Sequence, residues 1–288
     1  MIDIEHLETW VGRSETLRDV ITPFPSNALA ATLNRDEIYQ DGAALPPLWH
    51  WLHFLKVFKL ADAGYDGHPT LGGFLPPVPL PRRMWAGSRL RFAAPLRIGE
   101  AIEKTSAIAS VRHKAGRSGD LVFVTVRHVY GADARIEEEH DIVYRDAAVA
   151  DAPVSDAPVP DAPVAVPVMA PDTWDFAREM VPNPVLLFRY SALTFNGHRI
   201  HYDLPFCTGT EGYPGLVVHG PLLATLLLDL LRRQLPDAVV TDFEFRAIAP
   251  VFDTAPFTVH GAAVDDGYRL WIRRADGALA MDAKAVVT

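Results

Sequence analysis

The densest group of polar side chains in the sequence lies in the segment RYSALTFNGHRIHYD, Arg189 to Asp203. It contains His198 and His201, three residues apart, with Asn196 just before them. An imidazole with an ordinary pKa of about 6.5 can take a proton from water and return it to carbon near neutral pH. An amide has no useful basicity, so Asn196 is expected to orient water or a substrate carbonyl. The segment predicts acid-base chemistry with one titrating base, His201, and His198 as a weaker candidate.

A second group of candidate residues stands immediately before the most apolar stretch of the chain. His219 and Gly220 precede PLLATLLLDLLRRQ, Pro221 to Gln234. Glycine permits close approach of a ligand, and a helix that begins there adds its positive end. We therefore expect the backbone amide of Gly220 to be able to bind an oxygen that gains negative charge, and His219 to shape the turn.

The elements that must position these residues in the second half are a helix followed by strands. Pro221 to Gln234 is apolar almost all round, begins with proline and ends on arginines, which predicts a deeply buried helix. Alternating patterns and DDG and ADG turns predict four strands after it. These are Val239 to Ala249, Pro256 to Val264, Tyr268 to Arg274 and Ala278 to Val287.

The first half repeats this order of helix and strands. Ser26 to Asn34 and Pro47 to Leu60 are the helix candidates, the first with a serine cap and the second with amphipathic spacing. The phrase RFAAPL, Arg91 to Leu96, takes the place that FRAIAPV occupies in the second half. Four strands are predicted here too: Ser88 to Leu96, Ala101 to His113, Asp120 to Tyr130 and Arg135 to Tyr144.

Between the halves, residues 148–171 form an Ala/Pro/Asp-rich linker with a DAPV-type repeat, whose prolines block helix and sheet hydrogen bonding. The predicted domains are residues 1–147 and 172–288. A helix wrapped by an antiparallel meander, present twice, predicts an α+β double hot-dog. Two unrelated α+β domains are the alternative.

Both motifs resemble those of a known family. TFNGHRIHYD and the entry HGPLL resemble the MaoC-like enoyl-CoA hydratases, although Asn196 stands where that group has Asp, His198 where it has Asn and Arg199 where it has Pro. Together with LPPVPLPRRMWAGSRLRF, Leu75 to Phe92, they are similar to the two-domain subgroup of mesaconyl-CoA (3-methylfumaryl-CoA) and itaconyl-CoA hydratases and mitochondrial type 2 hydroxyacyl-thioester dehydratases. This resemblance spans nearly the whole chain.

The resemblance implies a hydro-lyase that adds water reversibly to a branched C5-dicarboxylic enoyl-CoA, giving citramalyl-CoA. Its second half would carry the chemistry, and its first half would bind substrate without catalysing. Candidates for holding coenzyme A phosphates or a substrate carboxylate are Arg82, Arg83, Arg189, Arg199 and His219. Asp203 and Glu211 rank second as catalytic carboxylates. Dehydration of a 3-hydroxyacyl thioester in fatty-acid synthesis, thioester hydrolysis and non-catalytic acyl-CoA binding are the alternatives.

Composition limits the partners. The formal net charge is −9 without any Lys/Arg block, which argues against nucleic acid. Cys207 is the only cysteine, and the acidic N-terminus does not look like a signal peptide, so a cytoplasmic location away from membranes is expected. A zinc ion on His198, His201 and His219 is an alternative, but the resemblance implies no metal. No glycine-rich phosphate loop occurs, so no cofactor is expected beyond the coenzyme A of the substrate. A homodimer of such chains is compatible with this fold.

Overall fold

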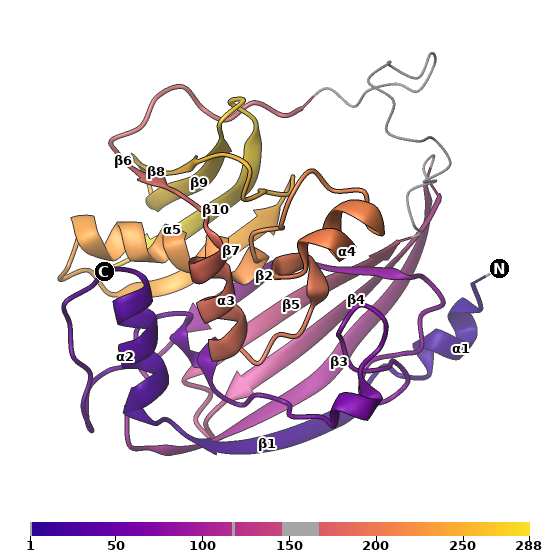
Figure 1. Ribbon diagram of the computed structural model, residues 1–288. Coiled ribbons are helices and arrows are strands. Elements are labelled where there is room, and N and C mark those ends of the chain that lie inside the picture. The colour runs from indigo at the N-terminus through magenta and orange to yellow at the C-terminus, as the bar shows by residue number, and fades with distance from the viewer. Residues whose placement is uncertain (1, 117–118, 146–166) are drawn as a thin grey trace.

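The computed structural model describes residues 2–116, 119–145 and 167–288, and these form one antiparallel sheet of ten strands (Figure 1). The strands are β1 (Ser14–Val20), β2 (Arg82–Phe92), β3 (Ala101–Gly116), β4 (Gly119–Tyr130), β5 (Ile136–Arg145), β6 (Phe176–Met180), β7 (Val240–Ala247), β8 (Phe257–Val264), β9 (Gly267–Arg274) and β10 (Leu279–Val287). Their order across the sheet is β1-β3-β4-β5-β2-β7-β10-β9-β8-β6. The eight strands predicted from alternation and turn signals are all present, with ends that shift by a few residues.

Each half contributes five strands in the same order. The first half runs β1-β3-β4-β5-β2 and the second runs β6-β8-β9-β10-β7, so β2 and β7 meet at the centre. In this central pair Gly87 lies opposite Arg246 and Arg91 lies opposite Asp242. The matching order about one antiparallel pair supports duplication, and the predicted α+β double hot-dog is confirmed.

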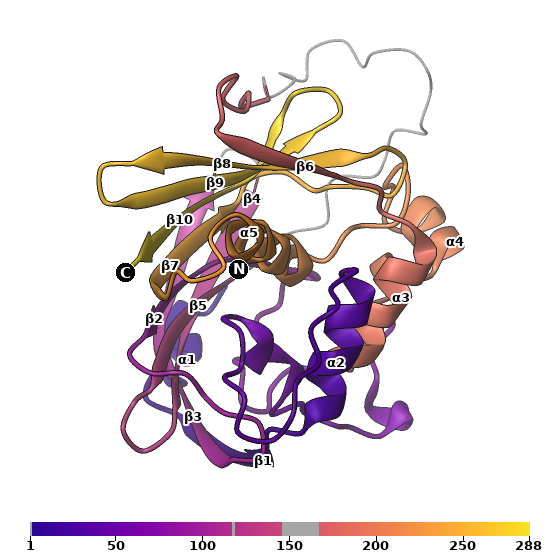
Figure 2. The ribbon, with the colours of Figure 1, turned by 90° about the vertical axis from the view of Figure 1, so that its left-hand side faces the viewer.

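The long helix α5 (Gly220–Gln234) packs against β8, β9 and β10 of its own half (Figure 2). Pro221 occupies the first turn, where its missing N–H costs nothing, and Arg232 and Arg233 complete the last turn. All residues from Leu222 to Leu231 are buried. The prediction of a deeply buried helix is therefore confirmed.

Asp229 is a buried acid in the middle of this apolar helix. Its carboxylate accepts hydrogen bonds from Arg35, Arg178 and Arg233 at 2.7 to 2.9 Å. Because Arg35 comes from the first half of the chain, this ion cluster joins the two halves beside a hydrophobic core that both halves share. A buried carboxylate requires such partners, since its desolvation is costly.

The predicted helix from Pro47 to Leu60 is wrong. This stretch is mostly irregular, with two short 3-10 turns at Trp49–Leu52 and Leu60–Asp62. Leu48 and Phe54 adopt left-handed backbone conformations, with φ of 69° and 58°, which an α-helix cannot contain. The aromatic residues that gave the helical spacing instead pack separately into the core, so the first half has no counterpart of α5 among the described residues.

The remaining elements are one helix that overlaps a predicted helix and several elements that the sequence did not predict. The helix α2 (Pro23–Thr32) overlaps the shorter helix candidate and packs against α3 (Pro184–Leu193) of the other half. The predicted serine cap is wrong, because α2 begins at Pro23 after Thr22 and Ser26 is buried inside the helix. The elements not predicted are β1, β6, α1 (Ile4–Glu8), α3 and α4 (Leu204–Gly209).

The domain boundaries remain a prediction. Most of the predicted linker, residues 148–166, lies outside the described residues. Its last part is described, and there Ala170 donates a backbone hydrogen bond of 3.0 Å to the carbonyl of Gly277. Within the described ranges, no helix is both long enough and apolar enough to cross a membrane.

Candidate active site

The predicted catalytic segment begins within α3 and is fixed after the end of this helix by local hydrogen bonds. The backbone turns at Phe195, which has a left-handed φ of 48°. The side-chain oxygen of Asn196 then accepts from the backbone N–H of His198 at 3.0 Å, and this closes a tight turn. A 3-10 turn at Arg199–His201 follows, and the Asp203 side chain caps α4. The polar composition of the segment therefore serves its shape as well as its chemistry.

His201 is placed as a neutral base. Its Nδ1 lies 2.7 Å from the carbonyl oxygen of Val217, and a carbonyl only accepts, so Nδ1 carries the proton. The second ring nitrogen, Nε2, is then left with a free electron pair. The side chain is buried, with 7% of the residue exposed, and this burial lowers the pKa of His201 to about 4. The imidazole is therefore unprotonated at neutral pH and ready to accept a proton.

His219 brings His201 to the entry of α5. The two rings stack with their centroids 3.7 Å apart and 18° between their planes. His219 Nε2 lies 2.7 Å from the hydroxyl of Ser191, which holds the ring against α3. Burial also keeps the pKa of His219 well below its ordinary value. The structure thus brings the two predicted motifs together, with the base beside the start of the apolar helix.

Gly220 is the first residue of α5, and the space in front of it is open. Apart from its chain neighbours and the backbone of its own helix, a Cβ atom built on this glycine would meet no atom within 4 Å. The first N–H groups of a helix have no partners inside the helix and carry partial positive charge. The position next to His201 and His219 is therefore suited to an oxygen that gains negative charge.

A loop from the first half, which the sequence analysis missed, packs onto the catalytic segment. The backbone N–H of Arg199 donates to the carbonyl of Asp66 at 2.9 Å. The Asp66 carboxylate lies 2.9 Å from Nδ1 of His68, whose ring lies 4.1 Å from that of His198. The motif YDGHP around these residues was the available signal, but nothing local links it to residues 130 positions later.

Asp66, His68 and His198 are also close enough together to be considered as ligands of a metal ion. The ligand atoms of Asp66, His68 and His198 all lie within 4.8 Å of one another. The hydrogen bond between Asp66 and His68 accounts for their approach, so we describe them as a carboxylate–imidazole pair. The alternative zinc set of His198, His201 and His219 has unsuitable geometry, because rings stacked face to face do not direct their nitrogens at one ion.

Among the predicted arginines, Arg83 is the one whose charge reaches the histidine cluster. Its positive charge contributes, after burial, to the lowered pKa of His68 and of His198. Arg82 pairs with the Glu211 carboxylate at 3.2 Å, and Arg199 pairs with Asp203 at 2.8 Å. These two arginines and the two carboxylates ranked second are thus engaged with each other in pairs. Arg189 lies exposed on α3.

The inner face of the first half's sheet carries a separate polar cluster around Glu138. This buried carboxylate lies within 3.1 to 3.4 Å of donor atoms on its neighbours. Although burial opposes ionisation, the hydrogen bond from His50 and nearby imidazoles keep the pKa of Glu138 low. The donors are His50, Trp51, Ser88 and Tyr130.

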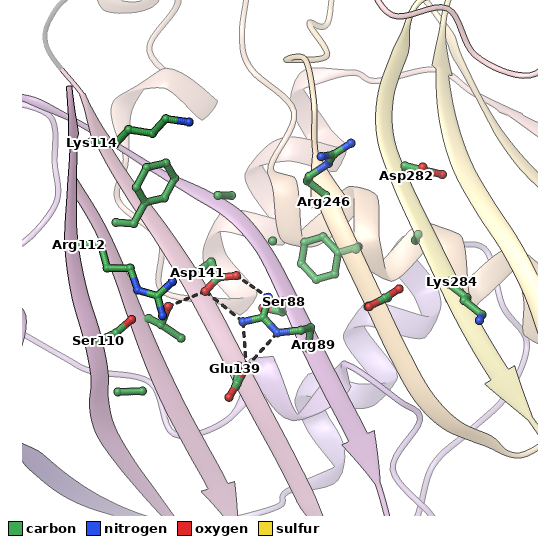
Figure 3. Close-up of a pocket in the computed structure, with 18 of the residues that line it drawn as sticks. Ser88, Arg89, Ser110, Arg112, Lys114, Glu139, Asp141, Arg246, Asp282 and Lys284 are labelled. Carbon is green, nitrogen blue, oxygen red and sulfur yellow. Dashed lines mark hydrogen bonds and ion pairs between the residues drawn. The ribbon is translucent and has the colours of Figure 1, made fainter. Parts of the chain in front are cut away.

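The opposite face of the sheet holds a broad, open cavity of about 1240 Å³ across the β2–β7 junction (Figure 3). Side chains alternate along a strand, so Glu139 and Asp141 face this cavity while Glu138 faces inward. Both acids pair with Arg89. No residue predicted for the active site lines the described part of this cavity, so it is separate from the histidine cluster.

Comparison with solved structures identifies the fold. The MaoC-like dehydratase of Phytophthora capsici superposes with a TM-score of 0.68 at 12% identity, over 99% of both chains. The HtdX protein of Mycobacterium tuberculosis gives a TM-score of 0.63 at 17% identity, over 95% of this chain and 99% of that one. At such low identity these similarities establish the double hot-dog fold of MaoC-like proteins and nothing finer.

Sequence comparison defines the family. Residues 48–253 match the hydroxyacyl-thioester dehydratase type 2 family. A mesaconyl-C(4)-CoA hydratase of Chloroflexus aurantiacus is 47% identical over 278 residues, 95% of each chain. A mitochondrial hydroxyacyl-thioester dehydratase type 2 of Schizosaccharomyces pombe is 28% identical over 283 residues, 90% of this chain and 92% of that one. The chain belongs to the hydroxyacyl-thioester dehydratase type 2 family and is a hydro-lyase, as its motifs predict.

Proposed function

We propose that this hydro-lyase adds water reversibly to a branched C5-dicarboxylic enoyl-CoA, mesaconyl-CoA or itaconyl-CoA, and forms citramalyl-CoA. The observation that carries the chemical part is the buried, neutral imidazole of His201 beside the open start of α5. The relative from Chloroflexus aurantiacus, which bears the name of a mesaconyl-C(4)-CoA hydratase, supports the choice of substrate.

For a double bond conjugated with the thioester, His201 would act as the single base. Nε2 takes a proton from water as the oxygen bonds to the β carbon, and the electron pair of the double bond moves onto the thioester oxygen. The Gly220 amide and the N-terminal end of α5 stabilise this enolate oxygen. The imidazolium then returns its proton to the α carbon, which restores the thioester. Asn196 uses its oxygen within the turn, so its NH₂ group remains to orient the water or the substrate carbonyl.

Arg83 is our choice for the group that holds the free carboxylate of the substrate. A guanidinium binds a carboxylate through two parallel hydrogen bonds, and Arg83 stands near the histidine cluster. Arg82 and Arg199 already have carboxylate partners, while Arg189 is exposed and free to meet a coenzyme A phosphate. His219 shapes the turn in front of α5 and contacts His201.

A second candidate function is the dehydration of a 3-hydroxyacyl thioester in fatty-acid synthesis. The family to which the chain belongs and the relative from Schizosaccharomyces pombe carry that activity in their names. The chemistry at His201 and Gly220 would run in the opposite direction. The two candidates differ in whether the acyl chain carries a carboxylate.

The test is to incubate the protein with a panel of enoyl-CoA and hydroxyacyl-CoA esters and to determine the mass of each product. We expect the mesaconyl ester to gain one water while coenzyme A stays attached. Release of the coenzyme A thiol would indicate a thioesterase, and a strong preference for a plain acyl chain would favour the second candidate. Turnover of no ester in the panel would favour the hypothesis of a non-catalytic acyl-CoA-binding protein.

The role of Arg83 is tested by Arg83→Met, with Arg91→Met, at an exposed position of the same strand, as the control. We expect the first change to raise the KM for mesaconyl-CoA at least roughly tenfold, because a paired guanidinium is lost. The KM for crotonyl-CoA, which has no free carboxylate, should stay within about twofold. Equal effects on both esters would remove Arg83 from carboxylate recognition.

A further inference from the structure

The loop that carries Asp66 and His68 is attached to the catalytic segment by its backbone. Arg199 donates its backbone N–H to the Asp66 carbonyl at 2.9 Å and its side chain to the Tyr65 carbonyl at 2.9 Å. Gly67, with a left-handed φ of 87°, lies so close to Gly197 that a Cβ atom on it would overlap the Gly197 carbonyl oxygen. These contacts thus fix the position of the loop relative to the segment that carries His198 and His201.

We call the contact between the loop of Tyr65 to His68 and the catalytic segment the seam. At this seam, four imidazoles form a row that ends on one carboxylate. The ring centroids are 4.1 Å apart between His68 and His198, 5.4 Å between His198 and His201, and 3.7 Å between His201 and His219. Asp66 stands at the His68 end, with Oδ2 at 2.9 Å from Nδ1 of that ring and at 4.0 Å from Nε2 of His198.

The catalytic segment has no unpaired carboxylate of its own in the described part of the chain. Asp203 caps α4 and binds Arg199, and Glu211 binds Arg82. The imidazole row becomes positively charged when His201 takes a proton from water. A cation in a site sheltered from water requires a nearby anion or it is strongly disfavoured.

We propose that Asp66 and His68, from the half expected to be non-catalytic, form the carboxylate–imidazole pair that orients His198 and supports positive charge in the imidazole row during turnover. They are positioning residues, since they act through His198 and His201. The inference rests on the proposed hydration chemistry. It also divides the catalytic machinery between both halves, so neither half is complete alone.

The charged and titratable groups that face His198 come from three segments. They are His68 and Asp66 from the loop, His201 from its own segment and Arg83 from β2. Asp66 alone favours a protonated ring, while the other three oppose it. Asp66 itself stays ionised, because the hydrogen bonds from His68 outweigh burial and keep the pKa of this carboxyl low.

The experiment compares Asp66→Asn with wild type on the best substrate of the panel. Asn keeps the oxygen that accepts the His68 backbone N–H at 3.0 Å, so the loop should hold its shape, but it loses the carboxylate oxygen that faces Nδ1. We expect kcat to fall roughly tenfold to a hundredfold with KM nearly unchanged. Removing the anion lowers the pKa of His68 and His198, and because these rings adjoin His201 in the row, we expect the acidic limb of the kcat profile to move to lower pH. Asp62→Asn, an exposed acid on the same loop, is the control and should leave both unchanged.

Three outcomes would overturn the proposal, provided that untreated wild type is active. One is an unchanged kcat in Asp66→Asn. Another is a lower kcat with a lower melting temperature and an unmoved acidic limb, which indicates a structural role only. The third is loss of wild-type activity with a chelator and its recovery with zinc, which indicates a metal site. In NMR spectra, the hydrogen-bonded Nδ1–H signal of His68 should be present in wild type and lost in Asp66→Asn, and this readout does not depend on which substrate is turned over.

Discussion

The two halves of the sheet have the same strand order, but different groups cover their inner faces. In the second half, the long helix α5 packs against the inner face of the sheet, and its N-terminal end lies beside a row of imidazoles. In the first half, there is no equivalent helix among the described residues, and a carboxylate, Glu138, is surrounded by four donors. One face offers a free base beside an open anion site, and the other offers a polar cluster whose acid is already satisfied.

This difference shows how a duplicated fold can separate stability from chemistry. A carboxylate with every oxygen occupied is held in place and has little left to offer a substrate. Each half has a buried imidazole Nδ1 with no partner among the described atoms, on His50 in the first half and on His219 in the second, but only that of His219 lies at the N-terminal end of a long helix. Unsatisfied polar groups of this kind are expected where a ligand completes the structure.

The largest effect should come from the seam between the halves. Gly67→Ala adds a Cβ that overlaps the Gly197 carbonyl, so the loop and the catalytic segment must separate. We expect kcat/KM to fall by about 10²-fold, since small displacements of catalytic groups have effects of that size. Gly12→Ala is the matched control, because Gly12 has a similar φ of 84° but open space around it. Equal losses in both variants would show that backbone strain, and not the seam, matters.

The polar cluster of the first half should affect stability more than chemistry. Glu138→Gln replaces a buried, hydrogen-bonded carboxylate with an amide, and we expect the free energy of unfolding to fall by about 2 to 3 kcal/mol. The kcat at 25 °C should stay within about twofold of wild type. Glu139→Gln, the neighbour on the outer face, should change stability by less than about 0.5 kcal/mol. A large loss of kcat in stably folded Glu138→Gln would place chemistry in the first half as well.

The start of α5 should respond to a single methyl group. Gly220→Ala fits without a clash, so the fold should be kept, but the methyl group narrows the approach to the backbone amide proposed to bind the thioester oxygen. We expect kcat/KM to fall roughly tenfold or more. Gly209→Ala, in another helix with open space at the same distance, is the control. Full activity in Gly220→Ala would separate the substrate from this helix entry.

Acid should weaken both halves. Burial lowers the pKa of His128 to about 3, of His140 to about 4 and of His201 to about 4. The unfolded chain binds protons on these rings near pH 6.5, so stability is complete above that pH and falls as the pH drops toward 4, by at most about 1.4 kcal/mol per pH unit for each ring. Melting temperatures between pH 7.5 and 5 measure this slope, and His128→Asn should reduce it. A flat profile would contradict neutral burial of the three rings.

The sequence predicted the elements that have a local signal, such as an alternating pattern or a characteristic residue at an end. The strands have alternating patterns with turn residues at their ends, and α5 has proline at its start and arginines at its end. The segment from Pro47 to Leu60 has helical spacing, but its aromatic residues pack individually and Leu48 and Phe54 turn left-handed. Tertiary packing decided that backbone, and no local pattern records it.

The candidate site divides in the same way. His201 and Gly220 belong to motifs that can be read along the chain, and the structure brings them together beside α5. Asp66 and His68 became visible only through their contacts with His198 and Arg199, which come from the other half. A contact between distant segments depends on how the two sheets join, which spacing alone does not determine.

The central claim, that the His201 imidazole is the base, is tested most directly by His201→Ala in the hydration assay, with His113→Ala as a histidine control outside the site. We predict that kcat/KM for His201→Ala falls by ~10²-fold or more while the melting temperature stays close to that of wild type. A folded His201→Ala protein that hydrates the substrate at the wild-type rate would contradict the account.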